Sequence, residues 1–178
     1  MELSTLSDEE LMVRVQSGNP QAYEMLFSRH SGSLFGYLRR RTGQDELAAD
    51  LFQETWLKVH RFSGSWRPDQ AFKPWLYGVA LNTARDAGRK SQRRVSTVML
   101  EHDRPQAPQA HAQRLTLEQA IEALPENLKD AFLLGAVHGM DHREIATQLD
   151  ISPANARARI SRARAFLRDW LHKRGGAK

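Results

Sequence analysis

The sequence predicts an all-α fold of two small helical domains joined by a flexible linker, with a helix-turn-helix in the second domain. Apolar residues recur three or four positions apart in nearly every segment, as they do on one face of an amphipathic helix. Helix-capping residues precede several of these segments. Between positions 95 and 113 this period is lost, in a run rich in Pro, Gln and Ala. The pattern therefore divides the chain into domains at 1–94 and 114–178, with a linker at 95–113.

The composition favours a nucleic-acid partner over a membrane. The 178 residues are 40% hydrophobic, enough for one or two modest cores, and carry a formal net charge of +5. The basic residues are clustered, and no apolar run approaches the length that spans a bilayer. The first residues, MELSTLSDEEL, lack the basic and then apolar order of a signal peptide. We expect a cytoplasmic protein that does not insert into the membrane and is a monomer when free.

The residue types argue against an enzyme. The chain has no cysteine, which excludes disulfides, Cys-based zinc fingers, iron-sulfur clusters and thiol nucleophiles. His138 and His142 stand four positions apart, but Gly139 and the helix cap at Asp141 interrupt the helix that a metal-binding pair needs. Acidic residues are scattered over amphipathic faces and form no paired acid-base site. We expect no catalytic residue, no bound metal and no cofactor.

Capping sequences mark where the first two helices begin. In a capping box, the Ser7 hydroxyl and the Glu10 carboxylate accept hydrogen bonds from each other's free backbone N–H groups, and this first helix ends near Gly18. The Asn-Pro pair that follows Gly18 starts a second helix, which runs to about Arg41.

A third helix, predicted at about 45–62, has one apolar face and one mostly charged face. Leu57 stands in the middle of the charged face. A leucine ringed by polar side chains is typical of an anchor that docks into a partner, but a lone surface leucine is an equally good interpretation. The charged face also includes Glu46, Asp50, Gln53, Glu54 and Arg61.

Aromatic and basic residues occupy adjacent stretches after the third helix. Residues 62–77 hold five aromatic residues beside Pro68 and Pro74, which indicate a loop, and residues 85–94 hold five basic residues and one acid. Rings that stack on bases, beside cations that neutralise phosphates, suit single-stranded nucleic acid. A packed core beside a solvated helix end explains the same residues and, on this cluster alone, is the favoured interpretation.

The second domain begins with two short helices and ends in a helix-turn-helix. Gly139 closes the second short helix, Asp141 caps the next one, and Ser152 and Pro153 begin the last. From position 151 to 178, eight basic residues stand against one acid, a net charge of +7 that exceeds the charge of the whole chain. The stripe predicted to face inward on the last helix is Ala156, Ile160, Ala163 and Leu167.

The exposed side of the last helix carries two rows of mostly arginine around small residues. Small side chains at the centre allow a close approach to base edges, while the rows reach phosphates or guanines. A solvated basic face is the alternative, but the caps, the turn and the inward stripe together favour DNA reading. One row is Arg157, Arg164 and Arg168, the other is Asn155, Arg159 and Arg162, and Ala154, Ala158 and Ser161 lie between them.

Three segments resemble those of extracytoplasmic-function sigma factors, the small bacterial subunits that give RNA polymerase its promoter specificity. They are DLFQETWLKV (50–59), FKPWLYGVALNTARD (72–86) and LKDAFLLGAVHGMDHREIATQLDISPANARARISRAR (128–164), in the family's order and spacing. A weaker match at 22–38 extends the resemblance over nearly the whole chain. It implies promoter-directed transcription initiation, with a sigma region 2-like domain at 1–94 and a sigma region 4-like domain at 114–178.

The resemblance also implies partners and residue roles. The third helix docks on the clamp coiled coil of core RNA polymerase, through Asp50, Gln53, Glu54 and Leu57. The helix-turn-helix reads the minus-thirty-five element and touches the polymerase flap, the linker threads the active-site cleft, and an anti-sigma factor holds such proteins inactive. The segment at 62–94 binds and melts the minus-ten element of promoter DNA, with a flipped base in a pocket. Its candidate contacts are Trp66, Trp75, Tyr77, Asn82, Arg85, Arg89 and Lys90.

The sequence departs from the family at three places. Asp150 stands in the turn where glycine is common, and Asp tolerates the left-handed conformation less well. Residues 153–156 (PANA) replace a more usual Val-Gly-Thr-Val, so the base preference is not inherited, and Pro74 shortens the start of the melting helix. The alternative function is a sigma-like decoy for an anti-sigma factor, or a repressor. A decoy does not need the basic recognition residues, and a repressor does not need the coiled-coil face.

Overall fold

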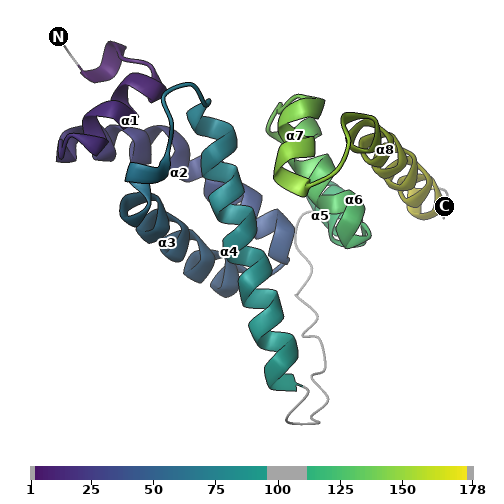
Figure 1. The fold of residues 1–178 in the computed structure, drawn as a ribbon. Helices are drawn as coiled ribbons and strands as arrows, with labels where there is room; N and C mark the ends of the chain where they lie inside the picture. The colour runs from purple at the N-terminus through teal and green to yellow at the C-terminus, as the bar shows by residue number, and fades with distance from the viewer. Residues whose placement is uncertain (1–2, 96–111, 176–178) are drawn as a thin grey trace.

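A computed structural model describes residues 3–95 and 112–175, whose regular elements are all helical (Figure 1), which confirms the all-α prediction. The N-terminal half (3–95) holds η1 (Leu3–Thr5), α1 (Asp8–Gln16), α2 (Pro20–Thr42), α3 (Asp45–Arg61), η2 (Ser63–Ser65) and α4 (Phe72–Val95). The C-terminal half (112–175) holds α5 (Ala112–Glu122), α6 (Glu126–Phe132), the π-helical segment η3 (Leu133–Val137), α7 (His142–Leu149) and α8 (Pro153–Gly175). The predicted linker at 95–113 lies, except for its ends, outside the described residues. None of the described helices is both long and apolar enough to cross a bilayer.

The first helices begin where their capping residues predict. The Glu10 N–H donates to Ser7 Oγ at 3.1 Å and the Ser7 N–H to Glu10 Oε2 at 2.7 Å, which completes the capping box of α1. Asn19 Oδ1 accepts from the Ala22 N–H at 3.0 Å and so caps α2. Each cap satisfies N–H groups that have no partner inside the helix.

The start of α4 differs from the expectation of a helix shortened by Pro74. The helix begins at Phe72, so Pro74 lies in its first turn, where a backbone N–H has no intrahelical partner to lose. Glu9 Oε1 of α1 accepts from the Phe72 N–H at 3.0 Å and satisfies one of these end groups. A carboxylate 63 residues away therefore helps to fix where α4 begins.

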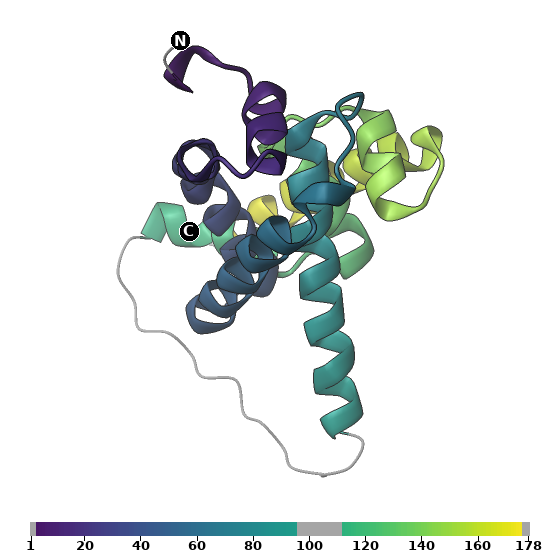
Figure 2. The ribbon, with the colours of Figure 1, turned by 60° about the vertical axis from the view of Figure 1, so that its left-hand side comes forward.

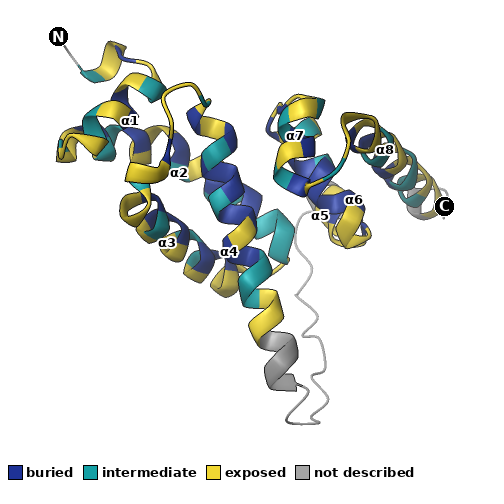
Figure 3. Cartoon of the chain, viewed as in Figure 1, coloured by how far each residue is buried: buried dark blue, intermediate teal, exposed yellow. Residues whose placement is uncertain are grey.

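In the N-terminal half, α1 to α4 bury their apolar faces against one another. Figure 3 shows the buried residues on the inner sides of these helices and the exposed ones outside. The far end of α4, which carries the basic run, projects away from the other helices (Figures 1 and 2). The largest side chains buried in this half are Trp66, Tyr37, Tyr77, Phe72, Leu11, Met12, Leu26, Leu34, Leu38, Leu76 and Leu81.

The C-terminal half contains the predicted helix-turn-helix. Asp141 and Glu144 form the capping box of α7, and the Asn155 N–H donates to Ser152 Oγ at 3.2 Å at the start of α8. Asp150 takes the left-handed conformation (φ 54°, ψ 53°), which reverses the chain between the two helices. The inward stripe of α8 is buried as predicted, at Ala156, Ile160, Ala163 and Leu167.

The two halves pack against each other, although the sequence predicts two domains joined by a flexible linker. Helix α5 contacts α2, and α7 lies beside the first part of α4 (Figures 1 and 2). The side chain of Arg41 on α2 pairs with Asp130 on α6, and Tyr77 on α4 hydrogen-bonds to His138. Because these partners are 89 and 61 residues apart, the pattern of each segment taken alone does not indicate the contact.

Candidate nucleic-acid interface

The outer face of α8 exposes most of its predicted contact residues. Six of the seven predicted contacts on this helix are exposed, as is Ala154 at the start of the strip of small residues. The exception is Arg159, which is half-buried because its guanidinium group lies toward α6 and Asn155. Its Nε donates to Asn155 Oδ1 at 3.3 Å, and its Nη1 lies 3.5 Å from the Asn127 carbonyl oxygen. The six exposed contacts are Asn155, Arg157, Ser161, Arg162, Arg164 and Arg168.

Two of the rings that the family resemblance named as candidate DNA contacts are buried, as the packed-core interpretation of this cluster predicts. Trp66 is 2% exposed and Tyr77 is fully buried, so neither ring is free to stack on a base in this arrangement. Tyr77 lies on the inner face of α4, with its ring centre 5.3 Å from that of Tyr37 and its hydroxyl 2.9 Å from His138 Nδ1. The packed-core interpretation applies to both rings. Trp75 is half-buried and packs against Phe72 with a ring-centre distance of 6.0 Å.

The polar candidates on α4 are more accessible than the aromatic ones. Asn82 is exposed on the outer side of the buried part of the helix, and Arg89 and Lys90 are exposed more than one turn beyond its end. Arg85 is half-buried, and its Nη2 lies 3.8 Å from Asp130 Oδ2 on α6. Arg85 therefore has an acidic partner within the protein.

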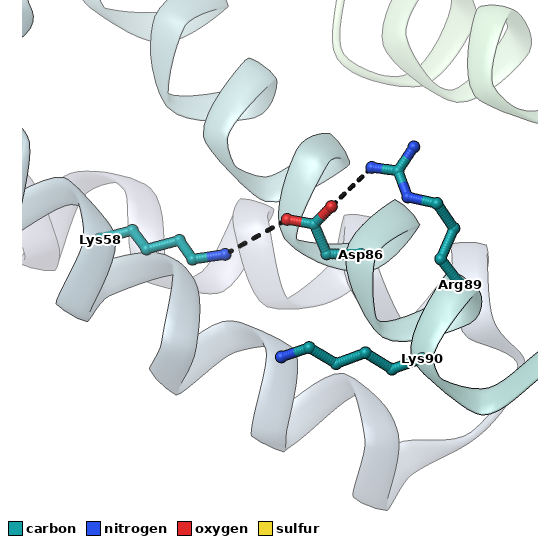
Figure 4. A pocket seen from close by; sticks show the side chains of 4 residues that line it. All are labelled: Lys58, Asp86, Arg89 and Lys90. Carbon is teal, nitrogen blue, oxygen red and sulfur yellow. Dashed lines mark hydrogen bonds and ion pairs between the residues drawn. The ribbon is translucent and has the colours of Figure 1, made fainter. Parts of the chain in front are cut away.

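A cavity of about 170 Å³ opens between α3 and α4, beside the basic run. It is lined by three cations, Lys58, Arg89 and Lys90, and one carboxylate, Asp86, which lies between Lys58 and Arg89 (Figure 4). Asp86 accepts from Arg89 Nη2 at 2.6 Å and lies 3.8 Å from Lys58 Nζ. The hydrogen bond from Arg89, together with the nearby cations, lowers the pKa of Asp86, so the carboxylate stays ionised at neutral pH. The cavity keeps an excess of positive charge.

Lys58 was not among the residues predicted from the sequence. It lies on α3, whose charged face is mostly acidic, and it is placed beside the basic run only by the packing of α3 on α4. The signal in the sequence was a single lysine one turn after Glu54, with which it also pairs at 3.7 Å. Such a spacing indicates an ordinary helix-surface pair as readily as a binding residue.

The four residues predicted to dock on a protein partner share the exposed face of α3. Asp50, Gln53 and Glu54 are exposed, and the Leu57 side chain is the most exposed large apolar residue among the described residues, at 63%. The predicted surroundings of Leu57 are thus confirmed, while its role stays a prediction. No group of three or more potential metal ligands occurs in the described part of the chain.

Comparison with known proteins identifies two matched regions. Residues 26–94 match the family model for Sigma-70 region 2, and residues 114–167 match that for Sigma-70, region 4. The chain is 30% identical to the ECF RNA polymerase sigma-E factor of Haemophilus influenzae, over 93% of this chain and 96% of that protein. It is 36% identical to the RNA polymerase sigma factor CarQ of Myxococcus xanthus, over 90% of this chain and 95% of that protein.

Solved structures of similar fold extend the likeness to both halves together. The structure of CnrH in complex with the cytosolic domain of CnrY matches 93% of this chain and 97% of that chain, with 26% identity and a TM-score of 0.71. The sigma factor RpoE of Bartonella quintana, in complex with the anti-sigma factor NepR, matches 84% of this chain and 96% of that chain, with 21% identity and a TM-score of 0.72.

Proposed function

The chain belongs to the extracytoplasmic-function sigma factor family. From this premise we propose which surface of the chain carries out each step of promoter-specific transcription initiation. As a member of that family it acts with core RNA polymerase and promoter DNA. The finer assignment divides the chain into a region 2-like domain at 1–94, a linker at 95–113 and a region 4-like domain at 114–178. It is a regulatory subunit without an enzymatic site of its own, and it works in the cytoplasm, where the polymerase transcribes.

The outer face of α8 reads the upstream duplex element. The observation that supports this most directly is the separation of its two faces, with an apolar stripe buried and Arg157, Arg162, Arg164 and Arg168 exposed on the outer side. Small central residues let the helix lie deep in a major groove, where guanidinium groups can reach guanines and phosphates. Because residues 153–156 depart from the sequence that is usual in the family, the upstream element should differ from that of relatives with the usual sequence.

The cavity between α3 and α4 holds a backbone phosphate of the separated minus-ten strand. Lys58, Arg89 and Lys90 converge on it with one carboxylate among them, which leaves a net positive site for an anionic group (Figure 4). Asn82 and the accessible part of Trp75 lie on the same helix and supply the candidate base contacts. The buried rings, Trp66 and Tyr77, support the position of α4 and are not proposed to touch DNA.

The exposed face of α3 docks on the clamp coiled coil of core polymerase. Leu57 provides an apolar anchor surrounded by polar groups, the arrangement typical of a binding hot spot. The helix-turn-helix also touches the flap, and an anti-sigma factor holds the free protein inactive. A protein partner of the free chain is supported by CnrH, a protein of similar fold whose structure is a complex with the cytosolic domain of CnrY.

Reconstitution with core polymerase tests this function. The purified chain is added to core enzyme and a library of genomic fragments, and the 5′ ends of the run-off transcripts are sequenced. We expect transcripts that start at a defined set of sites, share two upstream elements, and are missing when the chain is omitted. The absence of any start site that depends on the chain would contradict the assignment and favour a decoy or a repressor.

A further inference from the structure

Two polar side chains of α1 hold the chain on both sides of one mostly exposed loop. The loop is residues 67–71, which lead from the buried Trp66 to Phe72, the first residue of α4. Helix α1 lies beside η2 and beside the start of α4 (Figure 1). The side chains that reach these two elements are Glu9 and Gln16.

Gln16 holds the chain just before the loop. Its side-chain Nε2 donates to the Ser63 carbonyl oxygen at 2.9 Å and to the Trp66 carbonyl oxygen at 2.8 Å. An amide NH₂ group has two hydrogens, so one side chain can satisfy both acceptors. The two carbonyl groups belong to the first residue of η2 and to the residue that follows it. Gln16 therefore fixes the whole of η2 against α1.

Glu9 holds the chain just after the loop, because its Oε1 accepts from the Phe72 N–H at 3.0 Å. The first N–H groups of a helix have no acceptor inside it, so an acceptor from elsewhere helps to fix the position of the first turn. Trp75 lies in that turn, with its ring centre 6.0 Å from that of Phe72. The position of Trp75 therefore depends on that of Phe72.

Glu9 and Gln16 act from the same face of α1. They are seven positions apart, which is close to two full turns and about 10 Å along the helix axis. Leu11 and Met12 on this helix are fully buried and hold α1 in the core without either polar side chain. Loss of one hydrogen bond from Glu9 or Gln16 should therefore leave the fold in place.

Helix α1 is itself held firmly on α2. The Asp8 carboxylate at its first position accepts from Arg29 Nη1 at 2.9 Å and lies 2.6 Å from His30 Nε2. Arg29 also donates from Nη1 to the Leu6 carbonyl oxygen at 2.8 Å and from Nη2 to that of Ser4 at 2.7 Å. These contacts make α1 a fixed support from which Glu9 and Gln16 can hold another segment.

We propose that Glu9 and Gln16 are positioning residues for recognition of the minus-ten strand, because they fix both ends of the loop, and with them Trp75, before the DNA binds. The inference rests on the proposed function, in which the accessible part of Trp75 is a base contact. A segment that is already held loses less conformational entropy on binding, so a correctly placed base is bound more tightly. The two side chains act through the loop and Trp75 and not by contact with DNA.

Amide hydrogen exchange in the free chain, measured by NMR, tests whether the two contacts hold the loop. In Glu9→Met the Phe72 N–H loses its acceptor and should exchange about fivefold faster or more, whereas Glu9→Gln keeps an acceptor oxygen and should exchange as the wild type does. Gln16→Met should have the same effect at Trp66, whose N–H donates to the Ser63 carbonyl oxygen at 3.1 Å.

The matched controls for exchange are Glu24→Met and Gln21→Met, at exposed positions of α2. Neither should change the exchange of Phe72 or Trp66. Should Gln16→Met fail to fold, Gln16→Glu removes the donor without changing the size of the side chain. Unchanged exchange at both amides in the folded variants overturns the proposal.

Binding of the holoenzyme to DNA tests whether this hold serves recognition. Two promoter fragments with a melted minus-ten region differ only there, one with the bases of a start site found by reconstitution and one with those bases scrambled. Glu9→Met and Gln16→Met should each lower the ratio of the two affinities about fivefold, and Glu9→Gln should keep it. The salt dependence should stay as in the wild type, because the phosphate contacts of Lys58, Arg89 and Lys90 are unaltered.

The ratio separates positioning from a merely structural role. A general loss of folding or of core polymerase binding lowers both affinities equally, so an unchanged ratio in the folded variants overturns the proposal. If reconstitution with the wild-type chain yields no start site, the proposed function fails. Faster exchange in the variants would then show that the hold exists without serving minus-ten recognition.

Discussion

At the scale of single residues, Asp150 carries local backbone strain. It is the one non-glycine residue with positive φ in the described part of the chain, and it sits at the turn of the helix-turn-helix. Asp150→Ala should lower the free energy of unfolding by about 1 kcal/mol, because a Cβ without a polar side chain is less well tolerated in this conformation. Asp150→Gly should be at least as stable as the wild type. Urea denaturation measures both, and an alanine variant as stable as the wild type would remove the strain argument.

Arg162 is an exposed arginine of α8 whose contact can be identified by mutation. A contact with a base and a contact with a phosphate predict different losses of binding on different DNA sequences. If it contacts a guanine, Arg162→Ala should weaken binding of the holoenzyme to the upstream element by about 1–3 kcal/mol and leave binding to a scrambled element little changed. An equal loss on both duplexes would instead assign the side chain to a phosphate. Titration of labelled duplexes at fixed salt makes the comparison, because the phosphate contribution varies with salt.

At the scale of elements, the helices were largely predictable from the sequence because their signals are local. Capping boxes, the Asn-Pro start of α2 and the period of apolar residues act within a few positions. The residues that contact Trp66, Tyr77 and Lys58 in the folded chain were not predictable from such local signals. Tyr77 is buried because His138, 61 residues away, covers it, and Lys58 lines a cavity only because α3 packs on α4.

The exposed face of α3 predicts a variant that affects binding without affecting folding. Leu57 is 63% exposed, so Leu57→Ala removes little buried surface and should leave the melting temperature unchanged. If Leu57 anchors the contact with core polymerase, the affinity should fall by about 2 kcal/mol, or roughly thirtyfold. Leu47→Ala, which changes another exposed leucine of α3, is the matched control. Equal affinities of the two variants for core polymerase would exclude Leu57 as the anchor.

The cavity between α3 and α4 predicts a change in the salt dependence of strand binding. Lys58→Met keeps most of the aliphatic stem but removes the charge, so one phosphate contact should be lost. For a single strand, the slope of log affinity against log salt should become shallower by about 0.7. Arg61→Met, at the exposed end of the same helix, should leave the slope unchanged. Holoenzyme binding to a promoter fragment with a melted minus-ten region measures the slope, and an unaltered slope in Lys58→Met would contradict the phosphate site.

At the scale of the whole molecule, the contact between the halves is the feature that the sequence did not predict. Each side-chain contact between the halves joins residues far apart in the chain. The sequence around each of these residues also accounts for its presence without the contact. Asp130 and His138 fit an ordinary helix and its end, and Arg85 fits a DNA-binding run. Only the folded chain shows that these residues meet in one interface, and it is this interface that buries the Asp130 carboxylate beside the guanidinium group of Arg41.

His138 makes the packing of the halves sensitive to pH. Its ring lies between Tyr37 of α2 and Tyr77 of α4, and no hydrogen-bond partner for Nε2 occurs among the described residues. Burial, together with the positive charges of Lys73 on α4 and Arg40 on α2, lowers the pKa of His138 from 6.5 to about 4. The packed state therefore holds the neutral imidazole, whereas the unpacked state takes up a proton below its ordinary pKa.

The neutral His138 ring stabilises the packed state fully above pH 6.5, and this stabilisation is lost as the pH falls toward 4. Between pH 7 and pH 5 the loss should be about 2 kcal/mol in the free energy that separates packed from unpacked states. His138→Gln can still hydrogen-bond to Tyr77 but does not titrate, so its stability should fall less over this range. The raised pKa of Asp130 acts in the opposite direction and is common to both proteins, so it cancels in the comparison. Urea denaturation at the two pH values provides the measurement, and parallel losses in the wild type and His138→Gln would show that this histidine is not the sensitive group.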